Sequence, residues 1–141
     1  MSVSAGKLHS VVRDLRQLLD RADLFLGRVH RDMDAKSTER VDAERQMETV
    51  ISVVARRHGV PERLVYSRDR HETVVRVRQI CMAIGHDRLT LSQRAIGKLF
   101  RRSPLTVAFA LKTIRNLRET DPRFLASYNA VVAGVDKQLG S

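Results

Sequence analysis

Apolar residues recur at helical spacing along almost the whole chain, and this periodicity restricts the possible folds more than any other feature. Signals for strands are scarce: the sequence has no long alternation of apolar and polar residues, no Asn-Gly or Asp-Gly hairpin turn and only 4% aromatic residues. Its 141 residues suffice for one core of about 100 residues and an appendage. We therefore expect an all-α fold, a helical bundle preceded by a separate amphipathic N-terminal helix.

The first predicted helix spans residues 3–30 and carries a continuous apolar stripe. Apolar residues follow alternating spacings of three and four over three heptads. The stripe comprises Leu8, Val11, Leu15, Leu18, Ala22, Phe25 and Val29, widened by Val12, Leu19 and Leu26. Two arrangements would bury it: a homodimer or protein partner held through Leu8, Val11, Leu15, Leu18 and Phe25, or packing against the chain's own domain.

Residues 32–40 (DMDAKSTER) interrupt this pattern. They have no apolar periodicity and contain Ser37 and Thr38, which are favourable helix N-cap types. We expect a linker or a helix break here. The sequence thus predicts two parts: residues 1–36, an amphipathic helix and linker for oligomerisation or partner binding, and residues 37–141, a helical domain.

Glycine and proline divide the first half of this domain. A helix should run to Arg57 and end at His58-Gly59, and Pro61 should open a short helix over residues 61–65. The next helix should span residues 72–84 and end at Gly85, with Arg76 and Arg78 projecting away from its buried face.

Capping residues mark three further helices. Ser92 can cap a short helix that ends at Phe100, Ser103-Pro104 can open a longer one, and Asp121-Pro122 can open the last. The faces expected to be buried comprise Met47, Val50, Ile51 and Val54; Val74, Val77, Ile80, Cys81 and Ile84; Ile96, Leu99 and Phe100; Val107, Ala110, Leu111, Ile114 and Leu117; and Phe124, Leu125, Tyr128, Val131, Val132, Val135 and Leu139.

The net charge of +10 is concentrated in the middle of the chain. Residues 49–118 carry 15 basic and 4 acidic residues, residues 1–48 carry 9 of each, and residues 119–141 carry 2 basic and 3 acidic ones. A basic block of this kind is typical of proteins that bind polyanions, because Lys and Arg contacts to phosphates release condensed counterions. Double-stranded DNA is the expected partner, and a solvated Arg-rich surface is the alternative.

Other classes of protein find little support. No apolar run reaches the roughly 18 to 20 residues of a membrane-spanning helix, and no signal peptide is recognisable, so we expect a cytoplasmic, nucleoid-associated protein without membrane contact. The histidines are scattered, no HExxH pair occurs, and the lone Cys81 lies in an apolar run. We therefore expect no enzyme, no metal site and no cofactor.

The predicted helices on either side of residues 101–103 have the organisation of a helix-turn-helix. The hairpin lies inside the basic block, and its turn contains Arg101 and Arg102. Its second helix is apolar on one side only. The other side presents Leu105, Thr106, Phe109, Lys112, Thr113 and Asn116.

Residues 44–139 resemble the C-terminal DNA-binding domain of the bacterial replication initiator DnaA, which belongs to the Trp-repressor-like helix-turn-helix group. Landmarks occur in the same order: Gly59-Val60 after a first helix, the run RHETVVRVRQI at residues 70–80, and Leu91-Ser92 followed by Ile96-Gly97 and Phe100. Arg102, Thr106-Val107, Asp121-Pro122 and Phe124 complete the match.

The resemblance implies a role in DNA binding for particular residues. Arg78 matches an arginine that enters the minor groove, and Arg102 and Thr106 match positions that meet base edges in the major groove. The base-reading set is Arg78, Arg102, Ser103, Leu105, Thr106 and Phe109. The expected phosphate contacts are Arg68, Arg70, Arg76, Ser92, Gln93, Arg94, Lys98, Arg101 and Lys112.

Several of these residues have a structural alternative. Arg78 could pair with Glu72 on the helix surface, and Ser103 and Thr106 could simply cap their helix. Phe109 points outward or joins the core, depending on the rotation of its helix. These alternatives stay open at the level of sequence.

The chain also departs from the family it resembles. DnaA reads its target with Asp-His-Thr-Thr after the turn, whereas this chain has Ser103-Pro104-Leu105-Thr106. Pro104 has no N–H donor and Leu105 can make only apolar contacts, for example with a thymine methyl group. No Gly-x-x-x-x-Gly-Lys-[Ser/Thr] nucleotide-binding loop occurs in the sequence.

These observations favour a sequence-specific transcriptional regulator. The arrangement is similar to small phage-derived activators, including those that switch on gene transfer agents. Two other functions remain open: a replication accessory that binds initiator-type boxes, and a protein-interaction adaptor that docks through its basic surface.

Overall fold

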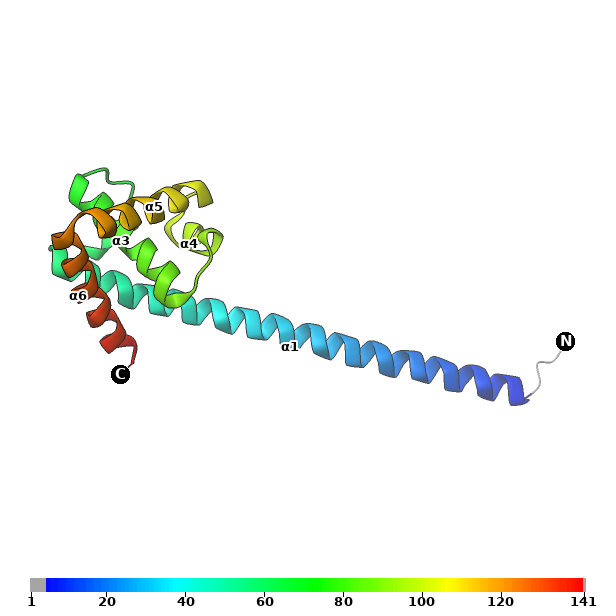
Figure 1. Ribbon diagram of the computed structural model, residues 1–141. Helices are drawn as coiled ribbons and strands as arrows, with labels where there is room; N and C mark the ends of the chain where they lie inside the picture. The colour runs from blue at the N-terminus through cyan, green and yellow to red at the C-terminus, as the bar shows by residue number, and fades with distance from the viewer. Residues whose placement is uncertain (1–4, 141) are drawn as a thin grey trace. The chain divides into compact units, whose positions relative to one another are not determined.

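The computed structural model describes the backbone of residues 5–140, and the side chains in that range except at residues 5–6, 24–25 and 27–39. The described residues form helices and no strands, which confirms the predicted all-α fold (Figure 1). The helices are α1 (Ala5–His58), α2 (Glu62–Val65), α3 (Glu72–Leu89), α4 (Gln93–Phe100), α5 (Pro104–Thr120) and α6 (Pro122–Leu139).

Helix α1 is continuous where a linker or a break was expected. Residues 32–40 are helical throughout, so that prediction was wrong. The segment has no glycine or proline, and Met33, Ala35, Lys36, Glu39 and Arg40 are good helix formers. A lack of apolar periodicity indicates only that a helix has no face to bury.

The chain divides into two compact units between Arg40 and Val41, a few residues beyond the expected boundary at residues 36–37. In the first unit, Leu8, Val11, Leu15 and Leu18 are between 54% and 60% exposed. The side chain of Phe25, which was predicted to share their contact surface, lies outside the described residues.

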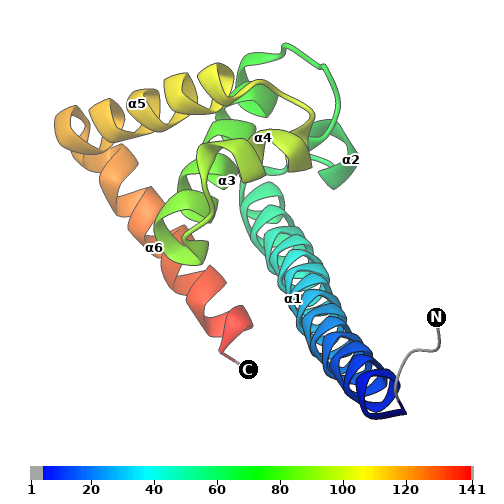
Figure 2. The same cartoon turned by 90° about the vertical axis from the view of Figure 1, so that its right-hand side faces the viewer.

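The second unit has one hydrophobic core, to which α1 contributes its C-terminal part. Helix α3 packs against α2, α4 and α5, and α5 also packs against α4 and α6. Figure 2 shows α5 joined at its end to α6, with α3 and α4 on the inner side of this corner. Of the residues expected in the core, Leu99, Leu111, Leu117, Phe124, Leu125 and Leu139 are partly buried and the others are buried.

Gly85 does not end α3, as the sequence had suggested. The helix continues to Leu89 and is closed by Thr90, which adopts a left-handed conformation with φ of 55°. Gly85 is buried, and a Cβ atom there would clash with the Met47 side chain of α1. The glycine therefore leaves room for the tip of the Met47 side chain, a role that the sequence alone could not distinguish from a helix end.

Capping residues begin the last three helices as predicted. The Ser92 hydroxyl accepts from the Ala95 N–H, at 3.1 Å, and the Ser103 hydroxyl accepts from the Thr106 N–H, at 3.2 Å. The Asp121 carboxylate accepts from two N–H groups of α6. Because these bonds satisfy donors that would otherwise be unpaired, they fix the points at which α4, α5 and α6 start.

A polar cluster fixes the far end of α5. Arg118 lies over the Tyr128 ring, 4.5 Å from its centroid, and donates to Asp87 of α3 at 3.3 Å. The Tyr128 hydroxyl donates to the same carboxylate oxygen at 3.4 Å. These contacts hold the C-terminal end of α5 to α3 and α6. The N-terminal end of α5 follows directly on the turn after α4.

No helix among the described residues is both long and apolar enough to cross a membrane.

Candidate nucleic-acid interface

The turn between α4 and α5 is short and tightly packed. Arg101 closes α4 in a left-handed conformation, with φ of 55°, and the Arg102 N–H donates to the Gly97 carbonyl at 2.8 Å. A Cβ atom on Gly97 would lie 2.5 Å from the Arg102 carbonyl oxygen. Only glycine permits this contact, so the residue sets the approach of the turn to α4.

The loop between α2 and α3 is folded by its own side chains. The Ser67 hydroxyl donates to the Leu64 carbonyl at 2.6 Å and accepts from the Asp69 N–H at 3.1 Å. The Asp69 carboxylate accepts from the His71 N–H at 2.7 Å. Tyr66 stacks on Phe100 of α4, with 5.9 Å between the ring centroids. These contacts keep the loop beside the turn of the hairpin.

Arg78 of α3 is the only buried charged residue among those described, with 6% of its surface exposed. Its Nε donates to the Val65 carbonyl at 2.8 Å, and its Nη2 lies within 3.2 Å of the Leu64, Ser67 and Asp69 carbonyl oxygens. The expectation that this side chain projects away from the buried face was wrong. Its partners are loop carbonyls rather than Glu72, so Arg78 holds the α2–α3 loop in place.

Arg102 joins the same loop from the other side. Its Nη2 donates to the Ser67 carbonyl at 2.7 Å, and its Nη1 donates to the Phe100 carbonyl at 2.6 Å. Arg78 donates to the same Ser67 oxygen at 2.8 Å. A single carbonyl therefore connects two guanidinium groups, one from α3 and one from the hairpin turn.

The positive charges of Arg68, Arg78 and Arg102 lie close enough to affect one another. Burial lowers the pKa of Arg78, and the charge of Arg102 lowers it further, while Asp69 acts in the opposite direction. Burial also lowers the pKa of Arg102, and the charge of Arg68 adds to the effect. Because arginine stays protonated in proteins, the like charges remain, and an anion bound beside them would be stabilised.

A cleft of about 320 Å³ opens at this point. Five arginines and a single acidic residue contribute to its lining, so phosphate is the ligand chemistry that it suits. It brings together six of the residues predicted to contact DNA, from three separate parts of the chain. The lining residues are Arg68, Asp69, Arg70, Arg78, Arg101, Arg102 and Thr106.

Comparison with known proteins agrees with this geometry. Residues 47–114 match the family model described as "Bacterial dnaA protein helix-turn-helix". This segment resembles the DnaA helix-turn-helix domain. The match covers α2, α3, α4, the turn and most of α5, together with the C-terminal part of α1.

The relatives of this chain include three proteins from different genera that carry the name "Chromosomal replication initiator protein DnaA". The protein of Mycoplasma pneumoniae is 36% identical over 72 residues, which cover 51% of this chain and 16% of the relative. The protein of Nitrosomonas europaea is 34% identical over 87 residues, which cover 61% of this chain and 19% of the relative. The protein of Neisseria meningitidis serogroup C is 28% identical over 138 residues, which cover 91% of this chain and 27% of the relative. The chain thus spans 16% to 27% of the lengths of these DnaA proteins.

The outer face of α5 in this DnaA-like hairpin is partly apolar. Leu105 is 82% exposed and Phe109 is 66% exposed, so Phe109 points outward rather than into the core. Lys112 and Asn116 continue the same exposed face. The Ser103 hydroxyl caps α5 and lies 3.1 Å from the Thr106 hydroxyl, which places both hydroxyls in a local hydrogen bond.

Several predicted phosphate contacts lie outside the cleft. Gln93, Arg94 and Lys98 are exposed on α4, next to the Ser92 cap. Arg76 is half-buried, and its Nη1 donates to the Gln79 side chain at 3.1 Å. The sequence analysis missed Ser67 and Asp69. The Ser67 carbonyl accepts from both Arg78 and Arg102, and the Asp69 carboxylate accepts from the His71 N–H within the loop. The pattern Ser-x-Asp before a helix was the one signal for such a loop.

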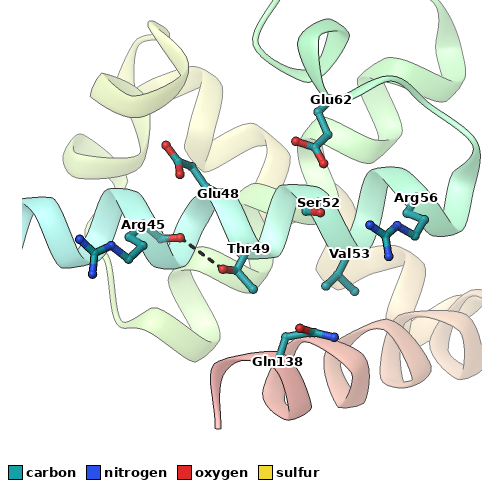
Figure 3. Close-up of a pocket in the computed structure, with 8 residues that line it drawn as sticks. All are labelled: Arg45, Glu48, Thr49, Ser52, Val53, Arg56, Glu62 and Gln138. Atoms are coloured by element: carbon teal, nitrogen blue, oxygen red, sulfur yellow. Dashed lines mark hydrogen bonds between the residues drawn. The ribbon is translucent and has the colours of Figure 1, made fainter. Parts of the chain in front are cut away.

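A second hollow, of about 400 Å³, lies between α1, α2 and α6 (Figure 3). Its charged lining is balanced, with Arg45 and Arg56 against Glu48 and Glu62. It contains none of the residues predicted to bind DNA. Among the described side chains, no group of three or more His, Cys, Asp or Glu is arranged to hold a metal ion.

Proposed function

We propose that the protein is a sequence-specific regulator of transcription that binds double-stranded DNA through its DnaA-like helix-turn-helix. The observation that carries this proposal is the arginine-lined cleft at the turn of the hairpin, within a segment of net charge +11. Helix α5 is the element of suitable size for the major groove, and its N-terminal end adjoins the cleft.

The proposed contacts follow from exposure. Leu105, Thr106 and Phe109 face outward at the start of α5 and would meet base edges. Arg68 and Arg70 are exposed on the α2–α3 loop and would reach the flanking phosphates or groove. Lys98 and Arg94 on α4, with Lys112 on α5, would contact the backbone on either side.

The two bonded arginines have a different proposed role. A minor-groove contact through Nε or Nη2 of Arg78 would require these atoms to leave four carbonyl oxygens. We therefore assign Arg78 to positioning the loop that carries Arg68 and Arg70. Arg102 is assigned two functions, positioning and DNA contact, because its guanidinium bonds to the Ser67 carbonyl and also lines the cleft.

A regulatory rather than an initiating role is supported by the altered reading residues. Ser103, Pro104 and Leu105 stand where DnaA has Asp, His and Thr. Neither Pro104 nor Leu105 can make the side-chain hydrogen bonds that read a base edge. The preferred site should therefore differ from the initiator box.

A role as a replication accessory is the second candidate, because the relatives named above are replication initiators. It predicts tight binding to a standard initiator box. An affinity for that box no better than for random duplex DNA would exclude it.

The exposed stripe of the first unit supports homodimerisation as part of the regulatory proposal. Leu8, Val11, Leu15 and Leu18 present apolar groups at heptad spacing on the surface of an otherwise charged helix. A two-fold dimer would read two half-sites about one helical turn apart.

Genome-wide mapping of the protein on DNA in its host tests the function. A few sharp peaks upstream of coding operons, sharing a motif unlike the initiator box, would support the regulator. Peaks at an origin would favour the replication accessory. A flat and salt-sensitive background would remove both and favour the adaptor.

A further inference from the structure

The most exposed large apolar side chains described in the chain lie one turn apart on α5. Leu105 and Phe109 are 82% and 66% exposed, whereas Val107, Ala110 and Ile114 of the same helix are buried in the core. The two residues hold the second and sixth positions of α5, in the half of a recognition helix that contacts base edges.

Basic residues precede and follow this apolar pair in the sequence. Arg101 and Arg102 adjoin it on the turn, and exposed Lys112 follows it on the same face of α5. The major groove has matching chemistry, since its rims are phosphates and its floor carries one apolar group, the C5-methyl of thymine. Charge complementarity thus favours duplex DNA over a neutral apolar partner.

Hydrogen-bonding readout is weak at the same point. Pro104 has no N–H, and the hydroxyls of Ser103 and Thr106 are bonded to each other at 3.1 Å. Leu105 and Phe109 have no side-chain donor or acceptor. At the positions of Leu105 and Phe109, discrimination between bases therefore depends on apolar contact.

We propose that Leu105 and Phe109 recognise the C5-methyl groups of thymines on nearby base pairs in the major groove. Four helical residues advance about 6 Å, which corresponds to about two base-pair steps of duplex DNA. The pair should therefore read two thymines within a short run. This inference rests on the proposed DNA-binding function and names the chemical group that is read.

The test starts with selection of preferred duplexes from a random library by the full chain. Each thymine of the selected duplex is then replaced by deoxyuridine, which lacks only the methyl group. We expect one or two positions at which this replacement weakens binding about fourfold, the ratio given by ~0.8 kcal/mol for one buried methyl group. Leu105→Ala and Phe109→Ala should each abolish the sensitivity at one of these positions.

Lys112→Ala is the matched control, because it alters the same exposed face without removing an apolar contact. It should weaken the thymine and deoxyuridine duplexes equally. Both apolar residues are on the surface, so circular dichroism should show unchanged helicity in the Leu105→Ala and Phe109→Ala variants.

The outcomes separate two kinds of failure. If selection yields no preferred duplex, the proposed function fails and this inference falls with it. If a preferred duplex emerges but contains no thymine that responds to deoxyuridine, DNA recognition stands and methyl reading is overturned. Methyl reading by these two residues is also overturned if both alanine variants keep the full sensitivity of the original protein.

Discussion

The two halves of α1 carry the same kind of apolar pattern, yet their side chains have opposite environments. Leu8, Leu15 and Leu18 in the first half are 54% to 60% exposed, whereas Val50 and Val54 in the second half are fully buried. Val50 and Val54 belong to the hydrophobic core of the second unit. Periodicity therefore predicts a helix with an apolar face, while burial depends on whether the chain supplies a neighbour.

The largest expected difference between the halves is in stability. Ile51→Ala removes a fully buried side chain and should lower the free energy of unfolding of the second unit by about 2 to 4 kcal/mol. Leu15→Ala should change it by less than about 0.5 kcal/mol, because that residue is exposed. Urea unfolding followed by tyrosine fluorescence measures this unit specifically, since both tyrosines, Tyr66 and Tyr128, lie in it. Similar losses in the two variants would contradict the comparison.

The polar interior of the second unit gives the next effect. Arg78→Ala removes a donor from four carbonyls of α2 and the α2–α3 loop, of which those of Leu64 and Ser67 keep another donor, and should cost about 1 to 3 kcal/mol of stability. Arg16→Ala, at an exposed arginine of the first half, should leave the unfolding transition unchanged. Hydrogen exchange adds a readout that a general loss of packing would not give. The α2–α3 loop should lose protection before the core of α3 does.

Substitutions in the apolar stripe of the first half should affect the proposed homodimer and not the stability of the second unit. Leu18→Asp should weaken the proposed dimer by about tenfold or more, because a charge at a heptad core position loses apolar contact and is desolvated. Gln17→Asp introduces the same charge one residue away, outside the stripe, and serves as the control. Light scattering over a range of concentrations reports the mass of both variants. A monomer in the original protein at every concentration would refute dimerisation.

The smallest effect concerns single surface charges. Arg94→Ala on α4 should lower DNA affinity uniformly and reduce the slope of log affinity against log salt by about 1. Arg13→Ala, at an exposed arginine of the first half, should leave that slope unchanged. Titrations of one duplex at several salt concentrations provide the measurement. Equal changes in slope would mean that basic residues act through overall charge rather than position.

Much of the second unit could be predicted because short-range chemistry determines it. Ser92, Ser103 and Asp121 cap their helices as expected, since an N-cap needs only the adjacent turn. The buried faces of α3, α5 and α6 also follow from spacing. The outward direction of Phe109, by contrast, depended on a helix rotation that spacing left open.

The failures share a dependence on distant residues. Gly85 resembles a helix end until Met47 is seen against it. Arg78 was expected to project away from the buried face, whereas carbonyl oxygens at a separation of 9 to 14 residues hold it inside. The continuity of residues 32–40 was missed for a different reason. An absent apolar face was interpreted as an absent helix.

Arg101 adopts a left-handed backbone conformation at the turn between α4 and α5. At φ of 55° glycine is unstrained, whereas a residue with a Cβ atom is disfavoured by about 1 kcal/mol. Selection for stability alone would favour glycine at this hinge. An arginine there adds a cation to the lining of the cleft, at a cost in turn stability that glycine would avoid.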